Sequence, residues 1–68
     1  MVKYRIIQRY EWYSPSGITW SKWYPTNSKV VENKDELKED FVRCQKRGKD
    51  LQKITKLQTE YKIDEIKK

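Results

Sequence analysis

The side chains with chemical potential in this 68-residue chain are cations and aromatic rings, because the chain has no histidine and one cysteine. Catalysis would therefore need a carboxylate as the base, held by an orienting group. The acidic residues of segment 35–40 lie among lysines, which is typical of the solvated flank of a helix. We therefore expect a protein that is not an enzyme.

Cys44, the single cysteine, fits a core position on a helix better than a reactive site. It cannot form an intrachain disulfide, which is consistent with a reducing cytoplasm, and without histidine a metal site is not expected. No run of residues approaches the ~20 apolar residues that span a bilayer. We expect a cytoplasmic protein with no metal, no cofactor and no membrane partner.

The chain is organised around segment 2–13, whose residues alternate as they would in a strand. One face is mostly apolar, and the other carries three cations. The apolar face contains Val2, Tyr4, Ile6, Tyr10 and Trp12. The basic face contains Lys3, Arg5, Ile7, Arg9, Glu11 and Tyr13.

A turn at Ser14-Pro15-Ser16-Gly17 separates this strand from a second one at 18–24, which predicts a hairpin. A loop closing on Tyr13 and Ile18 would place Trp20 on the basic face. A five-residue loop, 13–17, instead pairs Tyr10 with Trp20 and collects the rings on the apolar face. We favour the five-residue loop, which leaves Trp23 on the basic face.

Segment 34–47 is predicted to be a helix that begins after the N-cap residue Asn33 and ends before Gly48. Its apolar stripe is narrow and consists of Leu37, Phe41 and Cys44.

Segment 54–64 alternates with a period of two, from Thr55 to Ile63 on the inner face, which favours a third strand. A helical interpretation, which stays open, uses the 3.6-residue spacing of Leu51, Ile54, Leu57 and Tyr61.

These elements predict one α+β domain over residues 1–68, with ββαβ connectivity. A right-handed crossover through the helix places the third strand antiparallel to the first, so the sheet order is 2-1-3 with the helix on one face. The predicted core contains Tyr4, Ile6, Tyr10, Trp12, Ile18, Trp20, Leu37, Phe41, Cys44, Leu57, Tyr61 and Ile63.

The opposite face of this sheet is the predicted binding surface. It combines cations with aromatic rings, which suits either a protein interface or an anionic ligand such as a nucleotide or nucleic acid. Both interpretations stay open, as does a homodimer formed through this face. The predicted binding residues are Arg5, Ile7, Arg9, Tyr13, Lys22, Trp23, Lys56 and Lys62.

The pattern YRIIQRYEWYSPSGITWSKWY, followed by a capped charged helix and an alternating lysine-rich segment, resembles small accessory proteins of bacteriophages and mobile elements. The chain is also short and free of alanine. The resemblance implies a binder, often an anti-defence factor, that modulates a host protein in the bacterial cytoplasm. A structural component of the virion is a further alternative. The net charge of +6 does not support mimicry of acidic DNA.

Overall fold

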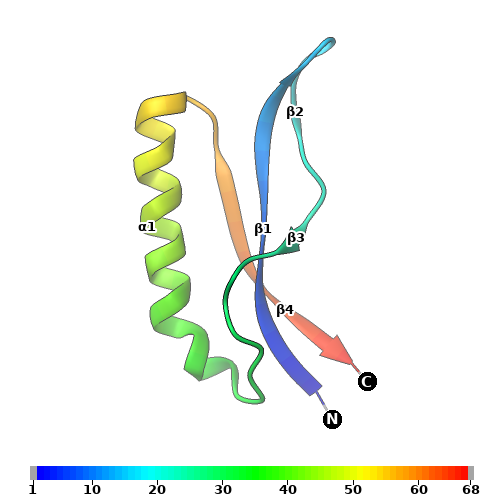
Figure 1. The fold of residues 1–68 in the computed structure, drawn as a ribbon, viewed down its shortest axis with the longest axis vertical. Helices are drawn as coiled ribbons and strands as arrows, with labels where there is room; N and C mark the ends of the chain where they lie inside the picture. Colours follow the sequence, from blue (N-terminus) through cyan, green and yellow to red (C-terminus); the bar gives the residue numbers. More distant parts are fainter. Residues whose placement is uncertain (1, 68) are drawn as a thin grey trace.

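The computed structural model describes residues 2–67 and shows one helix packed on an antiparallel four-stranded sheet (Figure 1). The elements follow the chain in the order β1 (Val2–Ser14), β2 (Gly17–Trp20), β3 (Tyr24–Pro25), the 3₁₀ turn η1 (Lys34–Leu37), α1 (Lys38–Thr55) and β4 (Thr59–Lys67). The predicted α+β class is therefore confirmed.

β1 is the central strand, as its two-faced sequence predicts. β4 pairs with one of its edges from Val2↔Lys67 to Tyr10↔Thr59, and both β2 and β3 pair with the other edge. The predicted order 2-1-3 holds, with β4 as the third predicted strand. The second predicted strand is divided into β2 and β3 by residues 21–23.

The predicted five-residue loop is wrong. β1 and β2 pair through Ser14↔Gly17 and Glu11↔Trp20, so the loop contains only Pro15 and Ser16. Gly17 has φ +122°, a backbone conformation that other residues rarely adopt. This register is shifted by one residue from the favoured one, which moves Trp20 and Ile18 to the opposite face of the sheet.

The helical segment begins after Asn33 as predicted, and the Asn33 side chain accepts a hydrogen bond from the amide of Asp35 at 3.0 Å. Its first turn is however the 3₁₀ turn η1, and α1 itself begins at Lys38. The predicted end is wrong, since α1 continues through Gly48 to Thr55. Gly48 lies on the inward stripe, four residues after Cys44, and it is buried. Its small size allows the helix to approach β4: a β-carbon at position 48 would lie 3.0 Å from Cε2 of Tyr61.

Because α1 is longer than predicted, the last strand begins later, at Thr59 instead of residue 54, and it ends at Lys67 instead of residue 64. The predicted alternation is nevertheless correct within the strand itself. Tyr61 and Ile63 pack against the core, whereas Thr55 belongs to the helix and Leu57 to the connection.

The core is small and lies between α1, β1 and the segment before η1. Ile6 and Leu37 are fully buried, and Val31 completes the cluster while its backbone bonds to Tyr4. Partly buried side chains from the helix and β4 surround this cluster: Phe41, Cys44, Tyr61 and Ile63.

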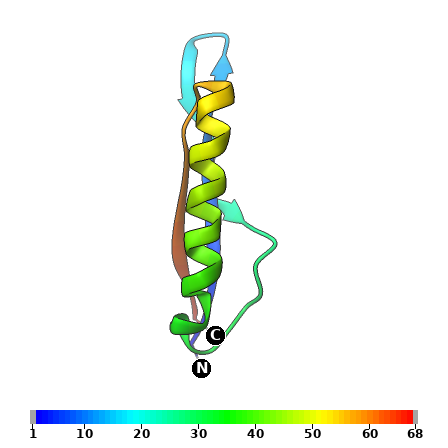
Figure 2. The same ribbon diagram turned by 90° about the vertical axis from the view of Figure 1, so that its left-hand side faces the viewer.

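The hairpin tip extends past the end of α1, and no helix covers it (Figures 1 and 2). Tyr10, Trp12 and Ile18 were predicted in the core but are exposed. Trp12 occupies the helix side of this projecting region, and Ile18 pairs with Tyr13 on the other side. Tyr10 lies opposite α1 and not beyond its end, since it lines a hollow together with Arg47 and Leu51 of the helix.

Candidate binding surfaces

A bulge in the chain between β2 and β3 brings two tryptophans to the same face. The β2 ladder pairs Trp20 with Glu11, whereas the β3 ladder pairs Tyr24 with Gln8, so residues 21–23 oppose only two residues of β1. Such an extra residue reverses the alternation of side chains on the bulged strand. Trp20 and Trp23 therefore both lie beside Arg9, on the face opposite α1, which we call the open face.

Ser21 closes the bulge with hydrogen bonds to both backbone groups of Tyr10. Its amide donates to the Tyr10 carbonyl at 2.8 Å, and its Oγ accepts from the Tyr10 amide at 2.9 Å. The Ser21 hydroxyl thus supplies an acceptor for the Tyr10 amide in place of a backbone carbonyl. These two hydrogen bonds hold the backbone of the bulge and thereby fix the positions of Trp20 and Trp23.

Arg9 is the centre of the open face. Its Cζ lies 4.4 Å from the ring centroid of Trp20 and 4.9 Å from that of Trp23, and its Nε donates to Glu60 at 2.7 Å. Planar guanidinium groups stack on aromatic faces and bind carboxylates at the same time. Arg9 therefore joins β2, the bulge and β4 through one side chain.

Lys62 and Arg5 extend this arrangement. The ammonium of Lys62 lies 4.4 Å from the ring centroid of Trp23, and Nε of Arg5 donates to Asp64 at 3.1 Å. The sequence correctly predicts that Arg5, Arg9, Trp23 and Lys62 share a face. Both arginines are neutralised within the molecule, a feature that alternation alone does not reveal.

Ile7 was predicted as a binding residue, but it is only 6% exposed. It lies between Pro25 and Lys62 in the two ladders, so neighbouring side chains on the open face cover it. Ile7 therefore supports the exposed side chains of the open face from beneath.

Three other predicted residues lie outside this centre. Tyr13 is 68% exposed and pairs with Ile18 at the projecting end of the open face. Lys22 is exposed in the bulge. Lys56 was predicted on the strand face but caps the C-terminus of α1 in the left-handed conformation, with φ 64°, because the helix continues past Gly48. Lys56 is therefore not part of the open face.

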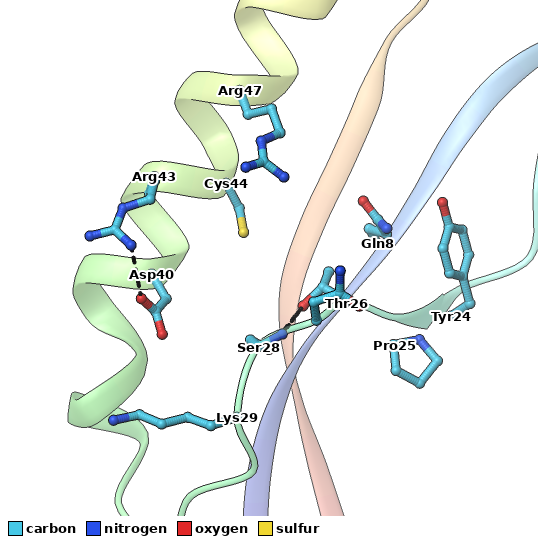
Figure 3. Close-up of a pocket in the computed structure, with 11 residues that line it drawn as sticks. Gln8, Tyr24, Pro25, Thr26, Ser28, Lys29, Asp40, Arg43, Cys44 and Arg47 are labelled. Atoms are coloured by element: carbon cyan, nitrogen blue, oxygen red, sulfur yellow. Dashed lines mark hydrogen bonds and ion pairs between the residues drawn. The ribbon is translucent and has the colours of Figure 1, made fainter.

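A second surface, missed by the sequence analysis, is a cleft of about 520 Å³ between α1 and the chain after β3 (Figure 3). Arg47 and Cys44 enter it from the helix, and Tyr24 lies across from them. A smaller hollow of about 330 Å³ shares these three residues and continues toward Tyr10 and Tyr61. The sequence signal for this cleft is limited to the cations Arg43 and Arg47 on one flank of the predicted helix.

The charge of the cleft comes from cations. Lys29, Arg43 and Arg47 line it together with one carboxylate, Asp40, which lies 3.8 Å from Arg43. Within residues 2–67, Lys29 and Arg47 have no carboxylate within ion-pair distance. The cleft therefore carries an excess of positive charge.

Three ionisable groups along the cleft stay neutral near physiological pH. Burial raises the pKa of the Cys44 thiol above its usual 9.0, although Arg47 opposes this shift. Burial likewise raises the pKa of the phenols of Tyr24 and Tyr61 above 10.0. Nearby Tyr10 raises the pKa of Tyr24 further, and nearby Cys44 raises that of Tyr61. A thiol with a raised pKa is a poor nucleophile, so Cys44 serves as a wall of the cleft.

Two further findings concern the described part of the chain. Residues 2–67 contain no group of three or more histidine, cysteine, aspartate or glutamate side chains placed to hold a metal ion. Over the same range, no helix has the length and apolar character needed to cross a membrane.

Comparisons of the chain with protein-family models, with curated proteins and with solved structures found no match. A functional proposal therefore depends on the geometry and charge of the two surfaces.

Proposed function

We propose that this chain is a small non-enzymatic binding protein that recognises another protein through its open face. The observation that carries the proposal is Arg9 held between Trp20 and Trp23 with its charge neutralised by Glu60. Tryptophan and arginine dominate the energetic centres of protein interfaces. Side chains fixed before binding lose less conformational entropy when a partner docks.

Charge favours a protein partner over nucleic acid at this face. Nucleic-acid affinity comes largely from cations free to neutralise phosphates, and from rings free to stack on bases. Arg5 already binds Asp64, Arg9 already binds Glu60, and two cations already stack on the Trp23 ring.

In accordance with the resemblance to phage accessory proteins, we propose that the partner is a host protein in the bacterial cytoplasm. We propose that binding inhibits or otherwise modulates that protein.

Affinity capture from a bacterial lysate with matched tryptophan variants tests this proposal. Trp23→Ala removes a ring from the open face, while Trp12→Ala removes one from the opposite face, where it is 43% exposed. We expect wild type and Trp12→Ala to capture the same host protein and Trp23→Ala to lose it. Capture of that protein by all three would contradict a role for the open face.

The cleft supports a second candidate function, the binding of a small anionic ligand such as a nucleotide. Its volume falls within the range of ligand sites, and Lys29 and Arg47 have free charges that could bind phosphate. The exposed ring of Tyr24 could pack against a base.

Calorimetric titration with ATP tests this second function. Arg47→Ala should abolish binding, whereas Lys46→Ala, which removes the same charge from the same helix outside the cleft, should preserve it. Equal losses in both variants would indicate nonspecific attraction to a basic surface.

A further inference from the structure

The outer edge of β4 is the longest uncovered strand edge in the described chain. β4 pairs with β1 over nine residues and has no strand on its other side. Figure 2 shows it at the margin of the sheet, with no other segment beside that edge. An edge of this kind presents a row of unpaired backbone groups to any strand that can match it.

The backbone hydrogen bonds show which residues present those groups. The amide of Glu11 donates to the carbonyl of Gln58 at 2.9 Å, in line with the ladder that pairs Tyr10 with Thr59. Backbone groups alternate in direction along an antiparallel strand. Even-numbered residues of β4 therefore face β1, and odd-numbered residues direct their amides and carbonyls outward.

The charges on β4 match a second copy of the same strand. Two β4 strands can pair antiparallel about a two-fold axis that passes through Ile63, and all nine residues of the strand then have a partner. Ile63 lies opposite Ile63 of the second copy, and because its amide and carbonyl are directed outward, the two residues form a hydrogen-bonded pair. Lys62 then lies opposite Asp64 of the second copy. By symmetry, Asp64 of the first copy lies opposite Lys62 of the second. These two positions form non-hydrogen-bonded pairs, in which cross-strand side chains are closest.

The other two-fold registers are poorer. An axis at Lys62 or at Asp64 places that charge opposite itself. An axis at Glu65 does the same for a glutamate. An axis at Tyr61 matches Glu60 with Lys62 but pairs only five residues of the strand, because β4 begins at Thr59.

We infer that two copies of this chain join through their β4 edges in the register centred on Ile63, forming one continuous antiparallel sheet. The two-fold axis is perpendicular to the sheet, so both α1 helices lie on one side and both open faces on the other. Asp64 is then shared between Arg5 of its own chain and Lys62 of the second copy. This inference does not depend on the identity of any host partner, since the dimer forms through backbone groups of the β4 edge and is measured by mass, although Lys62 and Asp64 also belong to the open face.

A proline variant tests the backbone pairing. Glu65 directs its amide outward, so Glu65→Pro removes a donor of the dimer and no donor of the β1–β4 ladder; proline is tolerated at such edge positions. Glu65→Ala keeps the donor and is the matched control. By sedimentation equilibrium we expect twice the chain mass of 8.4 kDa for wild type and Glu65→Ala. Glu65→Pro should sediment as a single chain with an unchanged circular dichroism spectrum.

A charge exchange tests the register even if the proline variant fails to fold. In a dimer of the Lys62→Asp variant, both cross-strand pairs between positions 62 and 64 consist of two negative charges. In a dimer of the Asp64→Lys variant, both pairs consist of two positive charges. Each variant alone should dimerise at least about tenfold more weakly than wild type. Mixed together, the two should form a heterodimer in which every pair is again opposite, detectable by native mass spectrometry.

Two results would overturn the inference. One is a single-chain mass for wild type at submillimolar concentration, where dimers of this kind assemble by mass action. The other is a mixture of Lys62→Asp and Asp64→Lys that yields no preference for the heterodimer over either homodimer.

Discussion

Arg9 contributes more to this molecule than its position in an alternating strand suggests. It binds two rings and one carboxylate that come from three different segments. Each cation–π contact at a partly exposed site contributes about 0.5–1 kcal/mol. We therefore expect Arg9→Ala to lower the free energy of unfolding by about 1–2 kcal/mol, measured by urea denaturation followed by tryptophan fluorescence.

The control for Arg9 is Arg43, which pairs with Asp40 at 3.8 Å on the helix and whose side chain is 74% exposed. Arg43→Ala should cost no more than about 0.5 kcal/mol, as is usual for such pairs. Arg9→Lys keeps the charge but loses the planar group, and it should fall between Arg9→Ala and wild type. Equal stabilities of the Arg9→Ala and Arg43→Ala variants would show that the two rings do not hold Arg9.

The basic face was predictable from the sequence, whereas the place of Trp20 depended on a choice between two hairpin registers, and the observed register, with Trp20 opposite Glu11, was not the favoured one. Alternation puts residues 20 and 23 on opposite faces, and only the extra residue in the bulge brings them together. The predicted register collected the rings toward a helix that was assumed to cover them. The actual helix leaves the hairpin tip uncovered, so burial of Trp20 offered no advantage that could fix that register.

At the scale of elements, Gly48 shows why the end of the helix was predicted wrongly. Glycine commonly follows a helix, but at position 48 it permits close packing of α1 on β4. The stripe of Leu37, Phe41 and Cys44 continues to Gly48 and Leu51 with the same spacing, which is the signal that a longer helix could have been inferred from. The glycine signal for a helix end at residue 48 conflicted with this periodicity. The packing of α1 on β4 favours the longer helix.

Gly48 also gives a prediction about how α1 and β4 meet. Gly→Ala inside a helix usually stabilises by about 0.5–1 kcal/mol. Here the new methyl group would lie 3.0 Å from the Tyr61 ring and 3.5 Å from the Thr59 carbonyl, so we expect the gain to be lost. Gly48→Leu should cost about 1–3 kcal/mol, because it forces the helix away from the strand.

A double-mutant cycle identifies the cause. In a Tyr61→Ala background the nearest atom is removed, and Gly48→Ala should recover its usual stabilisation. Thermal or urea unfolding of the wild type, the two single variants and the double variant gives the coupling free energy between positions 48 and 61. Additive effects would mean that the Tyr61 ring moves aside without cost and that the close approach does not explain the glycine.

At the scale of the whole molecule, the chain combines a small core with two distinct surfaces. Only Ile6 and Leu37 are fully buried among the described residues, which agrees with the limited core expected of 68 residues. The fold class and strand order followed from one amphipathic strand and one capped helix. The cleft did not, because it arises from the path of residues 26–31 across the helix side, which has no repeating pattern.

The groups along the cleft predict how stability depends on pH. The pKa values of Cys44, Tyr24 and Tyr61 are raised in the folded state by burial, so the folded chain keeps protons that the unfolded chain releases. Unfolding therefore releases protons, and the free energy of unfolding falls as pH increases from about 9.0 for the thiol and 10.0 for the phenols. Below these values the three groups are protonated in both states and add no pH dependence.

Tyr61→Phe isolates one of these contributions from the general loss of lysine charge at high pH. It removes the phenol that is buried beside Cys44 but keeps the ring that packs on Gly48. Urea unfolding of wild type and variant at a series of pH values should give parallel results up to pH 10.0 and a shallower decline for Tyr61→Phe above it. Tyr13→Phe is the control, since its phenol is at the exposed hairpin tip, and its curve should follow that of wild type. If the Tyr61→Phe curve also follows wild type above pH 10.0, burial of the Tyr61 phenol does not couple its ionisation to folding.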